Sequence, residues 1–179
     1  MLFGALIIFI TILFDQVTKQ LAQAYIPDLI SGQQGNIVII PRVLEFSYYQ
    51  NSGASFGIFE GEQLFFMIIT IIALAIFGYL FTDVNFKTKK VYSFAIAFFI
   101  GGTLGNAIDR ALFGYVIDFL HFPFLTPILN LFGSNNFYNN IADIVLSAAI
   151  VLFAIDLFIM EPKRKKKEKE NAIIDQDQS

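Results

Sequence analysis

Long apolar runs separated by polar segments dominate this sequence. Four of the runs are long enough for a helix to cross a bilayer, which takes about 20 mostly apolar residues. They cover Leu2–Tyr25, Leu64–Thr82, Val91–Phe113 and Ile141–Met160. The pattern therefore predicts an all-α membrane protein with four transmembrane helices.

Two segments between these runs do not have the pattern of a membrane span. Pro27–Gln63 contains the stretches Ile37–Ile40 and Leu44–Tyr49, whose apolar and alternating positions are typical of short strands. Gly114–Asn140 is rich in Phe and Leu but is broken by two prolines, so we expect it to lie along the membrane interface. A small β-rich segment is thus predicted between the first and second transmembrane helices.

The basic residues predict the orientation of the chain. Of the 12 lysines and arginines, three lie between the second and third spans and six follow the fourth. The positive-inside rule makes both regions cytoplasmic, which places both termini in the cytoplasm and the segments 27–63 and 114–140 outside. Residues 1–162 are then one membrane domain. We expect residues 163–179 to be a charged, disordered cytosolic tail that anchors this topology, although its basic cluster also suits anionic lipid.

Composition excludes several function classes. The chain is 56% hydrophobic and has a net charge of −3, so it offers no basic surface for nucleic acid. It has no cysteine and one histidine, His121, which excludes thiol catalysis and metal sites built from cysteines or several histidines. A Ser-His-Asp triad would depend on His121 alone, and we expect this residue to be an interfacial side chain.

Charged residues stand inside otherwise apolar spans. Asp15 and Lys19 are four residues apart on one helix face, and Asp109 and Arg110 share a face with Asn106. An unpaired charge at the centre of a span costs about 2.5–3.5 kcal/mol. These residues must therefore be paired or line a polar cavity. Asp109 and Arg110 could neutralise each other, and we expect both to support a site.

The predicted topology brings the polar residues to one depth. The first and third spans run outward, so Asp15 lies in the outer half of its helix, Asp109 lies late in the third span, and Asp118 follows just beyond it. The fourth span runs inward, so Asn140 and Asp143 lie at its outer end. This convergence predicts a functional site near the outer membrane surface.

Structural roles remain alternatives for some of these residues. Asp15 and Lys19 could form only an ion pair that locks the first span, and Asp156 is expected to be a solvated charge near the cytosolic helix end. For Asp118 and Asp143 a functional role is favoured, because two carboxylates from different elements reach one depth without an obvious cation for each. Two such carboxyls in contact share a proton, so one can act as a base and the other as an acid.

Five short motifs resemble those of the signal peptidase II family, in the same order along the chain. They are Asp15-Gln-Val-Thr-Lys19 (D-x-x-x-K), Asn51-Ser-Gly-Ala-Ser-Phe-Gly57 (N-x-G-x-x-F-G), Gly101-Gly-Thr-Leu-Gly-Asn-Ala-Ile-Asp-Arg110 (G-G-x-x-G-N-x-x-D-R), Gly114-Tyr-Val-Ile-Asp-Phe119 (G-x-V-x-D-F) and Asn140-Ile-Ala-Asp143 (N-x-A-D). The chain departs from the family pattern at Thr103, where alanine is commoner, and in a longer stretch between Asp118 and Asp143.

The resemblance implies an aspartic endopeptidase of the bacterial cytoplasmic (inner) membrane. Such an enzyme removes signal peptides from diacylglyceryl-modified prolipoproteins, cutting before the lipidated cysteine at the outer face, and is inhibited by globomycin-type compounds. It implies Asp118 and Asp143 as the catalytic pair and no metal or other cofactor. The remaining motif residues are implied to bind substrate or support the site: Asn51, Gly53, Asn106, Asp109, Arg110, Asn140, Asp15 and Lys19. We expect no partner besides the lipoprotein substrates and membrane lipid. We also expect the protein to be a monomer.

A small proton-coupled transporter is the alternative function, because transporters also carry acidic residues within spans. It predicts charges distributed along a path across the membrane. Here the ionisable residues cluster near one face, and the second span carries none. The sequence therefore favours the peptidase.

Overall fold

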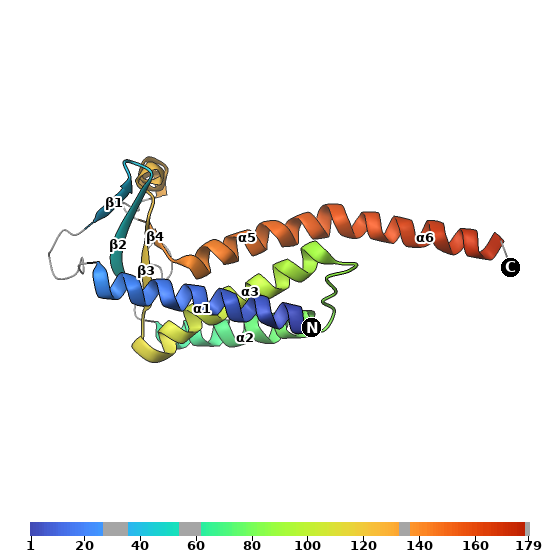
Figure 1. The fold of residues 1–179 in the computed structure, drawn as a ribbon, viewed down its shortest axis with the longest axis horizontal. Coiled ribbons are helices and arrows are strands. Elements are labelled where there is room, and N and C mark those ends of the chain that lie inside the picture. Colours follow the sequence, from blue (N-terminus) through green and yellow to red (C-terminus); the bar gives the residue numbers. More distant parts are fainter. Residues whose placement is uncertain (27–35, 54–61, 133–136, 178–179) are drawn as a thin grey trace.

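The computed structural model describes residues 1–26, 36–53, 62–132 and 137–177. In this part of the chain, four helices are long and apolar enough to cross a membrane. They are α1 (Leu2–Tyr25), α2 (Gln63–Phe81), α3 (Lys90–Phe113) and a continuous helix made of α5 (Ile141–Ile155), the π-helical turn η5 (Asp156–Met160) and α6 (Glu161–Asp177). Helices occupy all four predicted spans, with boundaries that agree to one residue except at the end of the fourth. Helix α3 is central and packs against α1, α2 and α5 (Figure 1).

A four-stranded antiparallel sheet stands at the end of the bundle where α1 ends and α5 begins (Figure 1). Its strands lie in the order β1 (Ile37–Ile40), β2 (Leu44–Asn51), β3 (Val116–His121) and β4 (Tyr138–Asn139). The first two strands were expected. The other two correct the sequence-based interpretation, because they come from the segment expected only to lie along the interface.

The sequence pattern did not predict strand β3, for a physical reason. All six of its residues are buried, because β2 and β4 pair with its two edges and the end of α1 packs against it. A strand covered in this way needs no polar side chains at alternate positions, and periodicity alone does not distinguish it from other short apolar runs.

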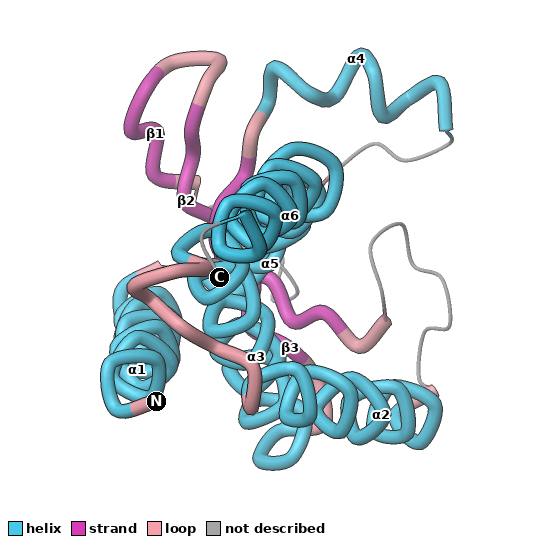
Figure 2. The backbone as a smooth tube through the Cα atoms, turned by 90° about the vertical axis from the view of Figure 1, so that its right-hand side faces the viewer, coloured by secondary structure: helices cyan, strands magenta, loops and turns pink. Residues whose placement is uncertain are grey.

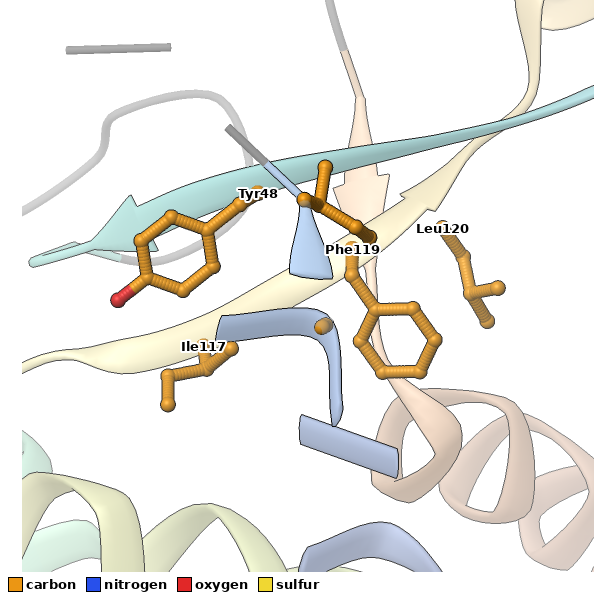
Figure 3. Packing of buried hydrophobic residues seen from close by; sticks show 6 residues of the cluster. Tyr48, Ile117, Phe119 and Leu120 are labelled. Atoms are coloured by element: carbon orange, nitrogen blue, oxygen red, sulfur yellow. The ribbon is translucent and has the colours of Figure 1, made fainter. Parts of the chain in front are cut away.

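An apolar cluster joins the sheet to the bundle. It comprises Ala22 and Ile26 from the end of α1, Tyr48 from β2, and Ile117, Phe119 and Leu120 from β3 (Figure 3). Burial of large apolar side chains typically stabilises by about 1.5–3 kcal/mol each. This contact therefore holds β3, which carries Asp118, at a fixed height against the helix ends.

The C-terminal segment differs from the disordered tail that was expected. It continues the fourth span as α6 (Figure 1), and pairs such as Glu161 with Lys165, 2.6 Å apart at i and i+4, support the helix. Asp156 is not a solvated charge either. It is buried, and both of its oxygens accept from the guanidinium of Arg164, at 2.7 and 2.8 Å. A buried carboxylate requires such a partner.

Three buried glycines of α3, Gly101, Gly102 and Gly105, let neighbouring helices approach closely. A Cβ atom added at Gly102 would lie 2.7 Å from the Leu146 side chain and 2.9 Å from the Ala142 carbonyl oxygen. One added at Gly105 would lie 2.7 Å from a carboxylate oxygen of Asp15. Side chains at these positions would separate α3 from α1 and α5.

Gly102→Ala is expected to lower the free energy of unfolding by about 1–3 kcal/mol, because overpacking forces the surrounding backbone to shift. Gly78→Ala in α2 is the matched control, since a Cβ atom there meets nothing within 4 Å. Thermal unfolding of the purified variants in detergent measures both. Equal melting temperatures for the two variants would show that the close approach of α3 and α5 is not needed.

Candidate functional site

A buried lysine joins the polar residues of the spans. The Lys19 ammonium lies 2.8 Å from Oδ2 of Asp15 and 3.0 Å from Oδ2 of Asp109, and it donates to Oδ1 of Asn106 at 3.0 Å. Lys19 and both carboxylates are fully buried. An ammonium group has three N–H donors and no acceptor, so all its hydrogen bonds are used within the protein. Asp109 thus pairs with Lys19 and forms no ion pair with Arg110 in the described part of the chain.

The two carboxylates also bind backbone groups from other elements. Oδ1 of Asp15 accepts from the amide of Ala142 at 2.8 Å, at the start of α5. Oδ2 of Asp109 accepts from the amide of Ile117 at 2.9 Å, in β3. The ion-pair cluster of α1 and α3 therefore fixes the start of α5 and the strand β3.

Asp118 is held by two asparagine amides. Its Oδ2 accepts from Nδ2 of Asn51 at 2.8 Å, and its Oδ1 accepts from Nδ2 of Asn140 at 2.7 Å. The backbone amide of Gly53 donates to Oδ1 of Asn51 at 3.1 Å, which leaves the Nδ2 group of that side chain for Asp118. Antiparallel pairing of β2 with β3 brings Asn51 and Asp118 together.

Asp143 is held by one asparagine side chain and one backbone amide. Its Oδ1 accepts from Nδ2 of Asn106 at 2.8 Å, and its Oδ2 accepts from the backbone amide of Asn140 at 3.2 Å. The Asp143 amide donates in turn to Oδ1 of Asn140 at 3.0 Å, which completes a capping box at the start of α5. Asn140 thereby contacts both carboxyl-bearing residues.

Asp118 and Asp143 line one cavity of about 170 Å³, which has room for water molecules. Its other lining residues are Asn51, Gly53, Asn106, Arg110, Val116 and Tyr138. The Arg110 guanidinium lies 4.7 Å from the centre of the Phe66 ring, and the same side chain borders a second, apolar cavity of about 220 Å³ between α2 and α3. A polar cavity with two carboxyls thus adjoins an apolar one.

The two carboxyls have different electrostatic surroundings. Burial, assisted by the negative charge of Asp143, raises the pKa of Asp118 from 3.8 to about 8, although the amides of Asn51 and Asn140 favour its ionised form. Asp143 lies in the first turn of α5, where the helix dipole stabilises a negative charge. At neutral pH the raised pKa of Asp118 favours its protonated form, and Asp143 lines the same cavity.

The structure brings the ten residues singled out in the sequence into one region. Six line the cavity: Asn51, Gly53, Asn106, Arg110, Asp118 and Asp143. The others stand behind them: Asp15, Lys19, Asp109 and Asn140. Positions 54–57 of the N-x-G-x-x-F-G motif lie outside the described residues. His121 is buried and hydrogen-bonded to Glu45 through Nδ1 at 3.2 Å, and it does not line the cavity.

Two contributors were not singled out in the sequence. Gln16 donates through Nε2 to Oδ1 of Asp109 at 2.8 Å and to the Gly105 carbonyl oxygen at 3.1 Å. Its position beside Asp15 in an apolar span is a signal that could have indicated it. Tyr138 lines the cavity only because β4 pairs with β3, and no sequence pattern predicted that pairing.

Lys19→Met is expected to lower the free energy of unfolding by about 3–5 kcal/mol, because it leaves two buried carboxylates without their cation. Lys89→Met is the matched control. Lys89 pairs with Asp83 at 2.5 Å, but both side chains are partly exposed, and exposed pairs contribute little. Thermal unfolding in detergent separates the two. A Lys19→Met protein as stable as the control would contradict a structural role for the buried cluster.

Comparison with known proteins identifies the family. The family model for signal peptidase (SPase) II matches residues 7–159. A protein from Listeria monocytogenes named lipoprotein signal peptidase is 34% identical over 160 residues, which cover 89% of this chain and 96% of that protein. One of the same name from Clostridium tetani is 37% identical over 155 residues, covering 84% and 88% of the two chains.

A solved structure also resembles this chain. A bacterial membrane enzyme that is 33% identical in sequence superposes with a TM-score of 0.71, over 92% of this chain and 92% of that chain. These likenesses extend over nearly all of the membrane domain and favour the peptidase over the transporter. The chain therefore belongs to the signal peptidase II family of membrane peptidases.

Proposed function

We propose that this protein is an aspartic endopeptidase that removes signal peptides from diacylglyceryl-modified prolipoproteins, with Asp118 and Asp143 as its catalytic residues. The names of its relatives support the substrate class. The observation that carries the catalytic assignment is that both carboxyl groups line one polar cavity, each held by two N–H donors. Two carboxyls with different surroundings suit acid–base catalysis.

In the proposed reaction, ionised Asp143 takes a proton from a water molecule as that water attacks the scissile carbonyl carbon. Protonated Asp118 donates its proton to the carbonyl oxygen, which gives a neutral tetrahedral diol. The diol then collapses: the ionised Asp118 takes a hydroxyl proton, Asp143 gives its proton to the leaving nitrogen, and the C–N bond breaks. Each carboxyl thus returns to its starting state, and a carboxylic acid and an amine leave.

Three neutral asparagines and one cation surround this pair. Asn51, Asn106 and Asn140 provide neutral donors, so the carboxyl oxygens keep their directions while protons move. The cation of Lys19 lies behind Asn106, one hydrogen bond away. We propose that Arg110 stabilises negative charge that develops in the transition state, because it carries a positive charge and lines the cavity.

The placement in the membrane follows from the same proposal. The sheet and the dyad face the outside of the bacterial cytoplasmic membrane, and both termini lie in the cytoplasm, as the basic residues of α6 suggest. A substrate held there by its acyl chains meets the site at the bilayer surface, and the apolar cavity beside Arg110 suits its apolar parts. Globomycin-type inhibitors would occupy the polar cavity. The protein acts as a monomer, since one chain supplies the whole dyad.

Asp118→Asn and Asp143→Asn are each expected to abolish cleavage while the protein stays folded, because asparagine keeps the shape but cannot exchange the proton. General acid–base groups typically contribute about 10²–10⁴-fold in rate, and groups that act as a unit lose most of this when either is removed. The double variant should therefore be little slower than either single variant. Purified protein in detergent, incubated with a diacylglyceryl-prolipoprotein and followed by gel shift, measures the loss.

Two controls make this test specific. Asp83→Asn changes an exposed carboxylate outside the site and should keep normal turnover. The same precursor without its diacylglycerol should not be cut by the wild-type protein. Near-normal cleavage by a folded Asp118→Asn or Asp143→Asn protein would refute the catalytic assignment, whereas equal cleavage of the unmodified precursor would refute only the substrate class.

A further inference from the structure

A short helical arm connects β3 to β4. It consists of the turn η3 (Pro123–Leu125), α4 (Thr126–Leu129) and the turn η4 (Asn130–Phe132). Figure 2 shows α4 displaced sideways from the bundle and running across the direction of the spans. Within the described residues, α4 packs mainly against the two turns that flank it. The arm therefore projects from the protein instead of closing over it.

The exposed face of the arm is apolar. Phe124, Ile128 and Leu131 are 54%, 55% and 81% exposed. Their spacing of i, i+4 and i+7 places them on one side of a helical segment. Residues 122–142 contain no Asp, Glu, Lys or Arg. Exposed apolar surface of this kind marks a contact with another apolar phase, and the missing charges give it no attraction to an ionic partner.

The position of the arm indicates which phase covers it. In Figure 1, α4 is the unlabelled gold-brown coil beside the sheet, and along the long axis it lies at about the level where α1 ends and α5 begins. Toward that end of the bundle α1 also exposes apolar side chains, such as Val17 at 46% and Leu21 at 51%, which a membrane span presents to lipid. The apolar face of the arm lies at the same height as this lipid-facing surface.

We propose that the arm Pro123–Phe132 lies in the sheet-side leaflet of the bilayer, parallel to the membrane surface, with Phe124, Ile128 and Leu131 among the acyl chains. Its lipid contact requires no anionic headgroup, because the arm carries no cation. The arm joins the strand of Asp118 to the helix of Asp143, so seating it in lipid sets the depth of both carboxyls. Only this consequence for the site rests on the proposed peptidase function; the lipid contact does not.

The absence of tryptophan from the chain allows a direct test with single-tryptophan variants. Leu131→Trp is reconstituted into phosphatidylcholine vesicles with and without brominated acyl chains, which quench tryptophan only by contact in the bilayer. Ile68→Trp, on the exposed surface of α2, is the lipid-facing reference, and Ile173→Trp, on α6 beyond the basic cluster, is the aqueous reference. The emission lost by Leu131→Trp should match that of Ile68→Trp.

Iodide present on both sides of the vesicles gives the complementary readout, and Phe124→Trp repeats the measurement in case Leu131→Trp does not fold. Strong quenching by brominated lipid with little quenching by iodide supports the proposal. Quenching by iodide alone, as expected for Ile173→Trp, would place the arm in water and overturn it. Protection from both quenchers would mean that a second copy of the chain covers the arm, which would overturn it as well.

Discussion

Lys19 places one positive charge between the carboxylates of Asp15 and Asp109, with none of the three exposed to solvent. In a low-dielectric interior an isolated charge costs several kcal/mol, and a pair is tolerated only when its remaining hydrogen-bonding capacity is satisfied. Here backbone amides from Ala142 and Ile117 bind the two carboxylates. The ion-pair cluster therefore requires α1, α3, α5 and β3 to meet at one place.

The same cluster orients the groups around the cavity. Because Lys19 donates to Oδ1 of Asn106, the Nδ2 group of that side chain faces Asp143. Because the Asp143 amide donates to Oδ1 of Asn140, the Nδ2 group of Asn140 faces Asp118. The directions of both carboxyls are thus fixed by neighbours whose own hydrogen bonds are already used. Such preorganisation is what acid–base chemistry at a fixed distance needs.

Hydropathy and residue spacing were sufficient to predict the helices. Apolar runs of span length located all four membrane helices, and charges inside those runs identified the cluster of Asp15, Lys19 and Asp109, because such charges are too costly to be accidental. The partner of each charge was less certain. Asp109 pairs with Lys19 across two helices, which no spacing within one helix predicts, so its neighbour Arg110 had seemed equally suitable.

The sheet and the C-terminal segment were harder to predict. Strand β3 is buried along its whole length and so lacks the alternation that marks a half-covered strand. The ion pair between Asp156 and Arg164 could not be predicted either, because Arg164 reaches Asp156 only when the helix continues through η5 into α6. Polar composition suggested disorder there, whereas ion pairs between successive turns support a helix.

The proposed mechanism depends most on Asp118 holding a proton at neutral pH. Since the pKa of Asp118 is raised from 3.8 to about 8, the folded protein binds a proton that the unfolded chain releases, and this proton is lost only as the pH rises through about 8. Infrared difference spectroscopy measures it directly through the C=O stretch of a protonated carboxyl group. We predict such a band in the wild-type protein at neutral pH, lost above pH 8 and missing from Asp118→Asn. Identical carboxyl spectra of the two proteins at neutral pH would contradict the proposed division of acid and base.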